Sequence, residues 1–232
     1  MSESKERPIL FSSEMVRAIL EGRKTQTRRA MKVQPFDWAT EFVEAPSEKL
    51  PGTGKPGHWL FGNNGFVSVR GCGRCPYGSI GDRLWVRETW QVDAPCDGTW
   101  DDVVFYGCKG ASLDFIPEKY KKPEHILYKA TWEDCVMSWR PSIHMPRWAS
   151  RITLEIVNVR VERVQDISEE DAAAEGLEID KDGFFFVNVP GNKYFNKSAK
   201  SIYAELWNKI YGSGSWEANP WVWVIEFKAV DQ

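Results

Sequence analysis

The residues best suited to chemistry lie in the segment Gly22–Arg29, where a lysine precedes a threonine by three positions. A threonine hydroxyl becomes a nucleophile when a neighbouring base takes its proton, and a lysine acts as that base when its pKa is lowered. Burial and nearby like charges both lower a lysine pKa. Three like charges flank Lys24 and Thr27: Arg23, Arg28 and Arg29. The segment predicts a Thr27 nucleophile activated by Lys24, and the alternative is a solvated basic turn.

The neighbouring sequence predicts a bend between a helix and a strand at Lys24. Ser13 is expected to cap a short helix that ends at Gly22. Its apolar residues fall at helical spacing: Met15, Val16, Ile19 and Leu20. Thr25, Thr27 and Arg29 then alternate as in a strand, so the lysine side chain is expected to fold back over the Thr27 hydroxyl.

A second candidate group is Glu175, at the end of a short predicted helix that Ser168 caps and Gly176 stops. Acidic residues in the first turn suit the helix dipole, but an anion in the last turn does not. The pKa of Glu175 is therefore expected to rise, which is a property of a general acid. The alternative is an ordinary solvated glutamate.

Cys72 and Cys75 form a Cys-x-x-Cys pair, which is half of a zinc site. No second close pair follows, and the available ligands are scattered: Cys96, Cys108, Cys135, His58, His125 and His144. Loop cysteines are the favoured reading, ahead of a metal site or a redox dithiol. We expect no metal and no other cofactor.

Residues 139–151 combine two tryptophans with three arginines and contain no carboxylate. Arginine beside tryptophan is typical of surfaces that stack on bases and grip phosphates. Arg147, Trp148 and Arg151 are therefore candidate RNA-binding residues. The alternative is that these tryptophans belong to the core, because 12 tryptophans cannot all be binding platforms.

Several other patterns predict the elements that would position these residues. Residues 83–87 alternate as a strand with Leu84 and Val86 on one face, and residues 152–164 alternate with a phase change near Ile156 that predicts a bulge. Residues 199–210 have the clearest helical period, ending at Gly212, and residues 221–227 predict a central strand of a closed sheet. A hairpin is expected at 58–70, with its turn at Asn64-Gly65. Short extended segments are expected around 103–106 and at 184–187, and residues 127–130 are expected to return to the main sheet.

Composition and charge limit the class of protein. The chain has 232 residues, 42% of them hydrophobic, with an odd number of cysteines and a net charge of −3, as expected of a globular protein with reduced thiols. Charge is sorted along it: residues 1–34 carry eight Lys/Arg against four Glu, and residues 160–182 carry three against nine Asp/Glu. The chain can thus form a basic cleft although its net charge is negative. No membrane span or signal peptide is recognised, and we expect a cytoplasmic protein that does not bind a membrane.

In the order of its motifs along the chain, the sequence resembles the ASCH-domain family of the PUA-like superfamily, especially its phage and prophage members. Four matching pieces occur in the family's order: Gly22-Arg23-Lys24-Thr25-x-Thr27-x-Arg29, Gly81-Asp82-x-Leu84-x-Val86, the helix from Ile167-Ser168-Glu169 to Glu175, and Val224-Ile225-Glu226-Phe227-Lys228. The resemblance implies an α+β fold: a small closed PUA-like β-barrel flanked by helices. The chain would be a single domain over 1–232, with insertions at about 33–80, 91–150 and 178–197 compared with the smallest members.

The resemblance also implies an activity. Some small members are amidohydrolases that remove the acetyl group from N4-acetylcytidine with a Lys, Thr and Glu set, which falls on Lys24, Thr27 and Glu175 here. Arg29 and Arg87 are candidates for stabilising the oxyanion or holding the modified nucleoside. Other members look like RNA-binding modules without catalysis, and a nuclease-associated role is a further alternative.

Overall fold

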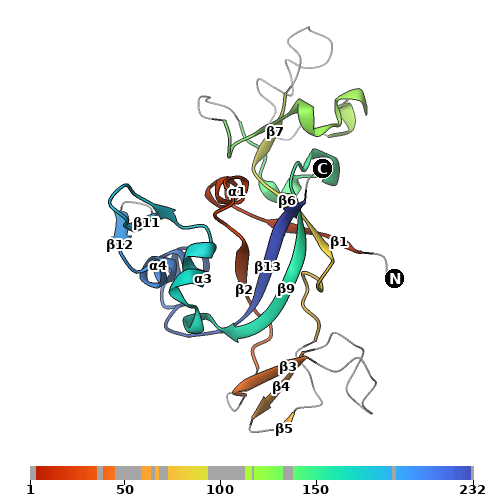
Figure 1. Cartoon of the computed structure of the whole chain (residues 1–232). Helices are drawn as coiled ribbons and strands as arrows, with labels where there is room; N and C mark the ends of the chain where they lie inside the picture. Colours follow the sequence, from red (N-terminus) through yellow and green to blue (C-terminus); the bar gives the residue numbers. More distant parts are fainter. Residues whose placement is uncertain are drawn as a thin grey trace.

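The computed structural model describes residues 4–35, 39–44, 59–63, 66–67, 73–93, 113–116, 118–132, 138–189 and 192–230. These residues form a mixed helix and sheet structure around one five-stranded sheet (Figure 1). In spatial order its strands are β1 (Glu6–Leu10), β6 (Arg83–Arg87), β9 (Thr153–Arg163), β13 (Trp221–Val230) and β2 (Gln26–Ala30). β1 pairs with β6 in parallel, and the other pairs are antiparallel.

The predicted central strand is confirmed, but the closed barrel is not. β13 lies between β9 and β2, and both of its faces are covered. Trp223 and Ile225 belong to one hydrophobic cluster, and Val222 and Val224 to another. Because neither face of β13 meets water, its sequence is a run of apolar residues and does not alternate between polar and apolar residues. β1 and β2 stand at the two ends of the strand order, so the described strands form an open sheet.

The bulge predicted in β9 is confirmed at Val157. Phe227 of β13 pairs with Ile156, and its neighbour Glu226 pairs with Asn158, which leaves Val157 without a partner in the register. The extra residue changes which side chains face the core. Leu154 and Ile156 consequently pack in the same hydrophobic cluster as Val159 and Val161, while Val157 is exposed.

Three α-helices pack on the sheet in the described residues: α1 (Ser13–Leu20), α3 (Glu169–Ala174) and α4 (Ala199–Tyr211). α1 is capped by Ser12 and not by the expected Ser13, because the Ser12 hydroxyl accepts the hydrogen bond from the Met15 N–H. The predicted caps at Ser168 and Gly212 are confirmed. α3 and α4 lie together on one side of the sheet, whereas α1 lies near its upper end (Figure 1).

Each of the three expected insertions contains a small sheet of its own. Their strands are β3 (Glu41–Glu44), β4 (Trp59–Asn63) and β5 (Phe66–Val67); β7 (Trp90–Val92) and β8 (Ile126–Tyr128); and β10 (Glu178–Ile179), β11 (Phe185–Val189) and β12 (Asn192–Asn196). The strands of the hairpin predicted at 58–70 are confirmed as β4 and β5, although its turn lies outside the described residues. β8 was expected to return to the main sheet, but it pairs with β7 alone because Trp90, Ile126 and Tyr128 form a separate hydrophobic cluster. The strand considered at 103–106 lies outside the described residues.

Single-turn 3₁₀ segments complete the described chain at Leu113–Phe115, Glu118–Tyr120, Pro123–His125, Ser142–His144, Arg147–Ala149 and Val164–Asp166. Among the described residues, no helix has the length and apolar character needed to cross a bilayer.

Candidate functional site

The C-terminal end of α3 lies against the start of β2, and this contact brings the lysine and glutamate together. Gly22 adopts φ 74°, the left-handed conformation that the predicted bend requires. The chain then returns, and Lys24 forms an isolated antiparallel bridge with Glu175. The Thr25 N–H donates to the Ala174 carbonyl at 3.0 Å. Residues 151 positions apart in sequence are therefore fixed by backbone hydrogen bonds as well as by their side chains.

Lys24 and Glu175 form a buried ion pair. Lys24 Nζ donates to Glu175 Oε2 at 2.8 Å and to the Glu175 backbone carbonyl at 2.7 Å. The two side chains are 0% and 3% exposed. Two donated bonds to one residue fix the ammonium group in position, and the absence of solvent strengthens the Coulomb attraction between them.

Burial lowers the pKa of Lys24, as the sequence predicts. The Glu175 carboxylate opposes this shift, while Arg29 and Arg28 add to it. Arg23, which was expected to contribute, instead pairs with Glu21 and donates to the backbone carbonyls of Gly176 and Leu177. Its charge is thus compensated by Glu21.

Arg28 holds the second oxygen of the same carboxylate. Its side chain is fully buried, and Nη1 donates to Glu175 Oε1 at 3.2 Å. The same guanidinium contacts Asp171 Oδ2 at 2.8 Å and Glu162 Oε1 at 2.7 Å. Arg160 joins both acids from the outer side, 2.6 Å from Asp171 and 3.1 Å from Glu162. Glu175, at the C-terminal end of α3, is therefore held by two cations inside a charged network.

Sequence reasoning assigned Arg28 only a like-charge effect and missed this network. Two signals in the sequence indicate it. Alternation in β2 places Gln26 and Arg28 on the face opposite Thr27 and Arg29. The acidic excess over residues 160–182 then supplies the carboxylates that a buried arginine needs.

Thr27 lies on β2 opposite Ile225 of β13 and is 3% exposed. Its hydroxyl makes no hydrogen bond with any described residue, and the expected fold of Lys24 over Thr27 is replaced by the Lys24–Glu175 pair. The two residues are near in the chain, but this structure does not join them. Catalytic hydrogen bonds are often absent before a substrate binds.

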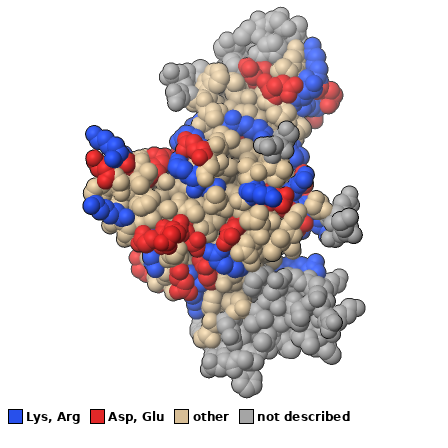
Figure 2. Space-filling model, viewed as in Figure 1, with Lys and Arg blue, Asp and Glu red and all other residues tan. Residues whose placement is uncertain are grey.

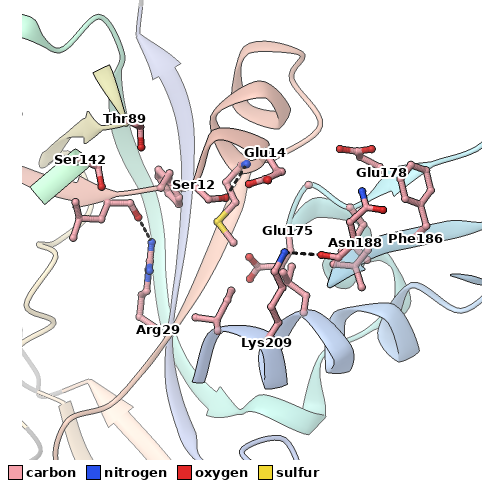
Figure 3. A pocket seen from close by; sticks show the side chains of 18 residues that line it. Ser12, Glu14, Arg29, Thr89, Ser142, Glu175, Glu178, Phe186, Asn188 and Lys209 are labelled. Carbon is pink, nitrogen blue, oxygen red and sulfur yellow. Dashed lines mark hydrogen bonds between the residues drawn. The ribbon is translucent and has the colours of Figure 1, made fainter. Parts of the chain in front are cut away.

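A cavity of about 490 Å³ opens beside this cluster (Figure 3). Glu175 and Arg29 reach its wall, whereas Lys24, Thr27 and Arg87 are not among its lining residues. Most of the wall is apolar, from Leu10, Phe11, Met15, Leu177, Phe186, Val187, Leu206 and Ile210. Its polar side chains are Ser12, Glu14, Arg29, Thr89, Ser142, Glu175, Glu178, Asn188 and Lys209. A mostly apolar wall with a few polar groups is typical of small-molecule sites.

The structure places Arg87 away from this cavity. Its Nε donates to the Met145 carbonyl at 3.0 Å, and its guanidinium lies 5.2 Å from the Trp85 ring centroid. The predicted face of β6 is correct, since Leu84 and Val86 are buried and Arg87 points the other way. That face contacts residues 142–145.

The predicted RNA-binding residues are held by contacts within the protein. Arg147 pairs with Glu6 at 3.0 Å, and Arg151 donates to both oxygens of the buried Glu88 at 3.0 and 3.1 Å. Trp148 packs edge-on against Trp90, with ring centroids 5.9 Å apart. Of these three residues, only Arg147 is exposed.

Of the Cys-x-x-Cys pair, Cys75 is buried and burial raises its pKa to about 11, whereas Cys72 lies outside the described residues. The scattered ligands considered with the pair are also largely outside them, since only His125 and His144 are described. Within the described parts of the chain, no group of three His, Cys, Asp or Glu side chains is arranged to hold a metal ion.

No protein-family model matches the chain, and comparison with curated proteins and with solved structures also gives no match.

Proposed function

We propose that the protein is an amidohydrolase that removes an acyl group from N4-acetylcytidine or a related modified nucleoside. The proposal includes membership of the ASCH-domain family and a PUA-like arrangement of the five-stranded sheet. Rapid hydrogen exchange along the outer backbone edges of both β1 and β2 would contradict that arrangement.

One observation carries the proposal: Glu175 binds a buried lysine and also lines an apolar cavity. A carboxylate in this position can exchange a proton with Lys24 over 2.8 Å and present it to a substrate. Arg28 supports this role because it fixes the second carboxylate oxygen. A purely structural ion pair does not require access to a cavity.

In the proposed reaction, one proton shared by the pair rests on Glu175, which leaves the Lys24 amine neutral. Lys24 then takes the proton of Thr27, and the Thr27 oxygen forms a bond to the acyl carbon. The bond from this carbon to N4 breaks, and the amine leaves with the proton from Glu175. Glu175 next takes a proton from water, and the water oxygen forms a bond to the acyl carbon. The bond from this carbon to the Thr27 oxygen breaks, and Lys24 returns its proton to that oxygen, which releases the acid and restores the hydroxyl. Because Thr27 lies behind the cavity wall, this attack requires the wall to move when substrate binds.

The test is hydrolysis of N4-acetylcytidine by the purified protein. Thr27→Val should lower the rate by about 10³-fold or more, because the nucleophile is lost at nearly constant volume. Lys24→Arg should have a similar effect, because a guanidinium cannot act as a base near neutral pH. Thr25→Val is the matched control, since Thr25 is exposed and two positions away. Wild-type rates in Thr27→Val, or no activity on any acylated cytidine, would exclude this function.

The alternative is an RNA-binding module without catalysis, and the contacts of its candidate residues weigh against it. Glu6 and Glu88 neutralise Arg147 and Arg151. On the face shown in Figure 2, basic and acidic side chains are interspersed. A salt titration of RNA binding tests this alternative, because Arg147→Ala should flatten the salt slope if that residue contacts phosphate.

A further inference from the structure

The cavity beside Glu175 has two ends that differ in charge. Arg29, Thr89 and Ser142 lie toward one end, Glu178 and Asn188 lie toward the other, and Glu14 lies near the middle (Figure 3). Glu175 lies between them, with its charge countered by Lys24 and Arg28 behind the wall. A ligand that fills the cavity therefore meets Arg29 at one end, and both Glu178 and the Lys209 ammonium toward the other.

Among the described residues, no carboxylate neutralises the charge of Arg29. Its Nη2 donates to the Leu10 carbonyl at 2.6 Å, and its guanidinium carbon lies 5.3 Å from the centroid of the Phe11 ring. Its Nε is buried and has no hydrogen-bond partner in the described structure, where Arg29 also forms no ion pair. Arg29 also lines the cavity, so an anionic ligand there would meet a guanidinium that has donors to spare.

Two hydroxyl groups accompany Arg29 at this end. Thr89 lies between β6 and β7, and Ser142 begins a 3₁₀ turn. Their backbones are fixed, because the Thr89 carbonyl accepts from Lys129 at 3.0 Å and the Ser142 carbonyl accepts from Met145 at 3.1 Å. Neither hydroxyl has a hydrogen-bond partner among the described residues, so both are free to donate to a ligand.

The rest of the cavity carries charges of both signs. Lys209 Nζ donates to the Asn188 carbonyl at 2.6 Å. Glu14 is partly buried, which by itself raises its pKa, but hydrogen bonds from its own backbone and from Ser12, together with the Lys209 charge, lower the pKa overall. Glu14 therefore stays ionised, and Glu14 and Glu178 make these parts of the cavity less favourable for an anion than the Arg29 end.

We propose that Arg29, Thr89 and Ser142 form an anion subsite, so that the ligand carries a carboxylate or phosphate group. This inference rests on the proposed function for the rest of the ligand. Two sources of the anion share this chemistry: a 5′-phosphate on the cytidine, or a distal carboxylate on the acyl group. The guanidinium supplies charge, and the hydroxyls supply two further donors to oxygen.

Calorimetric titration of the full chain tests the subsite without requiring turnover. The probes are cytidine, cytidine 5′-monophosphate, N4-acetylcytidine and N4-succinylcytidine. One anionic probe should bind at least about tenfold more tightly than its neutral counterpart, in the range of a single charge-assisted contact. A preference for the monophosphate identifies a phosphate subsite, and a preference for the succinyl compound identifies a carboxylate subsite.

Substitutions of the lining residues show which of them cause the preference for an anionic probe. Arg29→Gln should abolish the preference, and Thr89→Val and Ser142→Ala should each reduce it several-fold. Arg29→Lys, which keeps the charge, should retain part of it, and circular dichroism should show that each variant is folded. Arg83→Gln, an exposed arginine that does not line the cavity, is the matched control.

Equal affinity for the neutral and anionic probes, or no binding of any of them, would overturn the subsite. A preference that survives Arg29→Gln but is lost in Lys209→Gln would overturn its location. Hydrolysis is measured separately: anion-selective binding without turnover leaves the subsite intact and excludes the amidohydrolase, whereas turnover with no anion preference excludes the subsite alone.

Discussion

Gly176 lies directly against Lys24, and this contact sets the position of the buried ion pair. A Cβ added at Gly176 would come within 2.8 Å of Lys24 Cβ and 2.7 Å of Ala18 Cβ. Gly176 also has φ 90°, a conformation that side chains rarely adopt. The close approach of α3 to Lys24 therefore requires glycine at this position for two separate reasons.

Gly176→Ala should destabilise the protein by roughly 2–4 kcal/mol, because overpacking is added to backbone strain. Gly183→Ala separates the two effects, because Gly183 has φ 81° and no atom within 4 Å of an added Cβ. Gly183→Ala should lower the free energy of unfolding by only about 1 kcal/mol. Urea unfolding of both variants measures the difference, and equal losses would show that the contact with Lys24 does not matter.

Arg28 is the second determinant of the site. Arg28→Met should lower the free energy of unfolding by about 3–5 kcal/mol, because Glu175 and its neighbouring acids lose a buried partner. Arg160→Met is the matched control, since Arg160 joins the same acids with its side chain 29% exposed. It should cost only about 1 kcal/mol. Comparable losses in chemical denaturation would refute a special role for the buried arginine.

Sequence patterns predicted local structure well where one periodicity governs a segment. The bulge at Val157, the cap at Ser168 and the central position of β13 all follow from alternation or capping chemistry. The helix cap at Ser12 was displaced by one residue because adjacent serines have equal capping chemistry.

The sequence was less informative about what the functional side chains contact. Lys24 and Thr27 are close in the chain, but the nearest acceptor for the lysine is Glu175, which is 151 residues away. The sequence predicted that Arg151 binds RNA, but in the structure Arg151 forms an ion pair with Glu88. Such pairings depend on which faces pack together, and residue spacing within one segment does not encode that. The cavity itself is lined by residues of α1, α4, β1, β2, β10 and β11 and of four connecting segments, so no single stretch of sequence indicates it.

Cys75 should be unreactive in the folded protein. Burial raises its pKa to about 11, so the reactive thiolate is scarce at pH 8. Peptide mapping after a brief iodoacetamide treatment should find Cys75 unmodified in native protein and fully alkylated in urea. Rapid modification without denaturant would show that this thiol is accessible and more acidic than its burial implies.

The lowered pKa of Lys24 should make stability depend on pH. Burial favours the neutral amine in the folded protein, against the attraction of Glu175, whereas the unfolded chain keeps an ordinary lysine pKa of about 10.4. Between the folded and unfolded pKa values, the unfolded state binds more protons, so the contribution of Lys24 to stability increases as the pH rises. Urea unfolding of wild type and Lys24→Met from pH 7 to pH 10 isolates this contribution. Wild type should gain stability relative to Lys24→Met as the pH rises toward 10, and a constant difference across the series would show that Lys24 keeps an unshifted pKa.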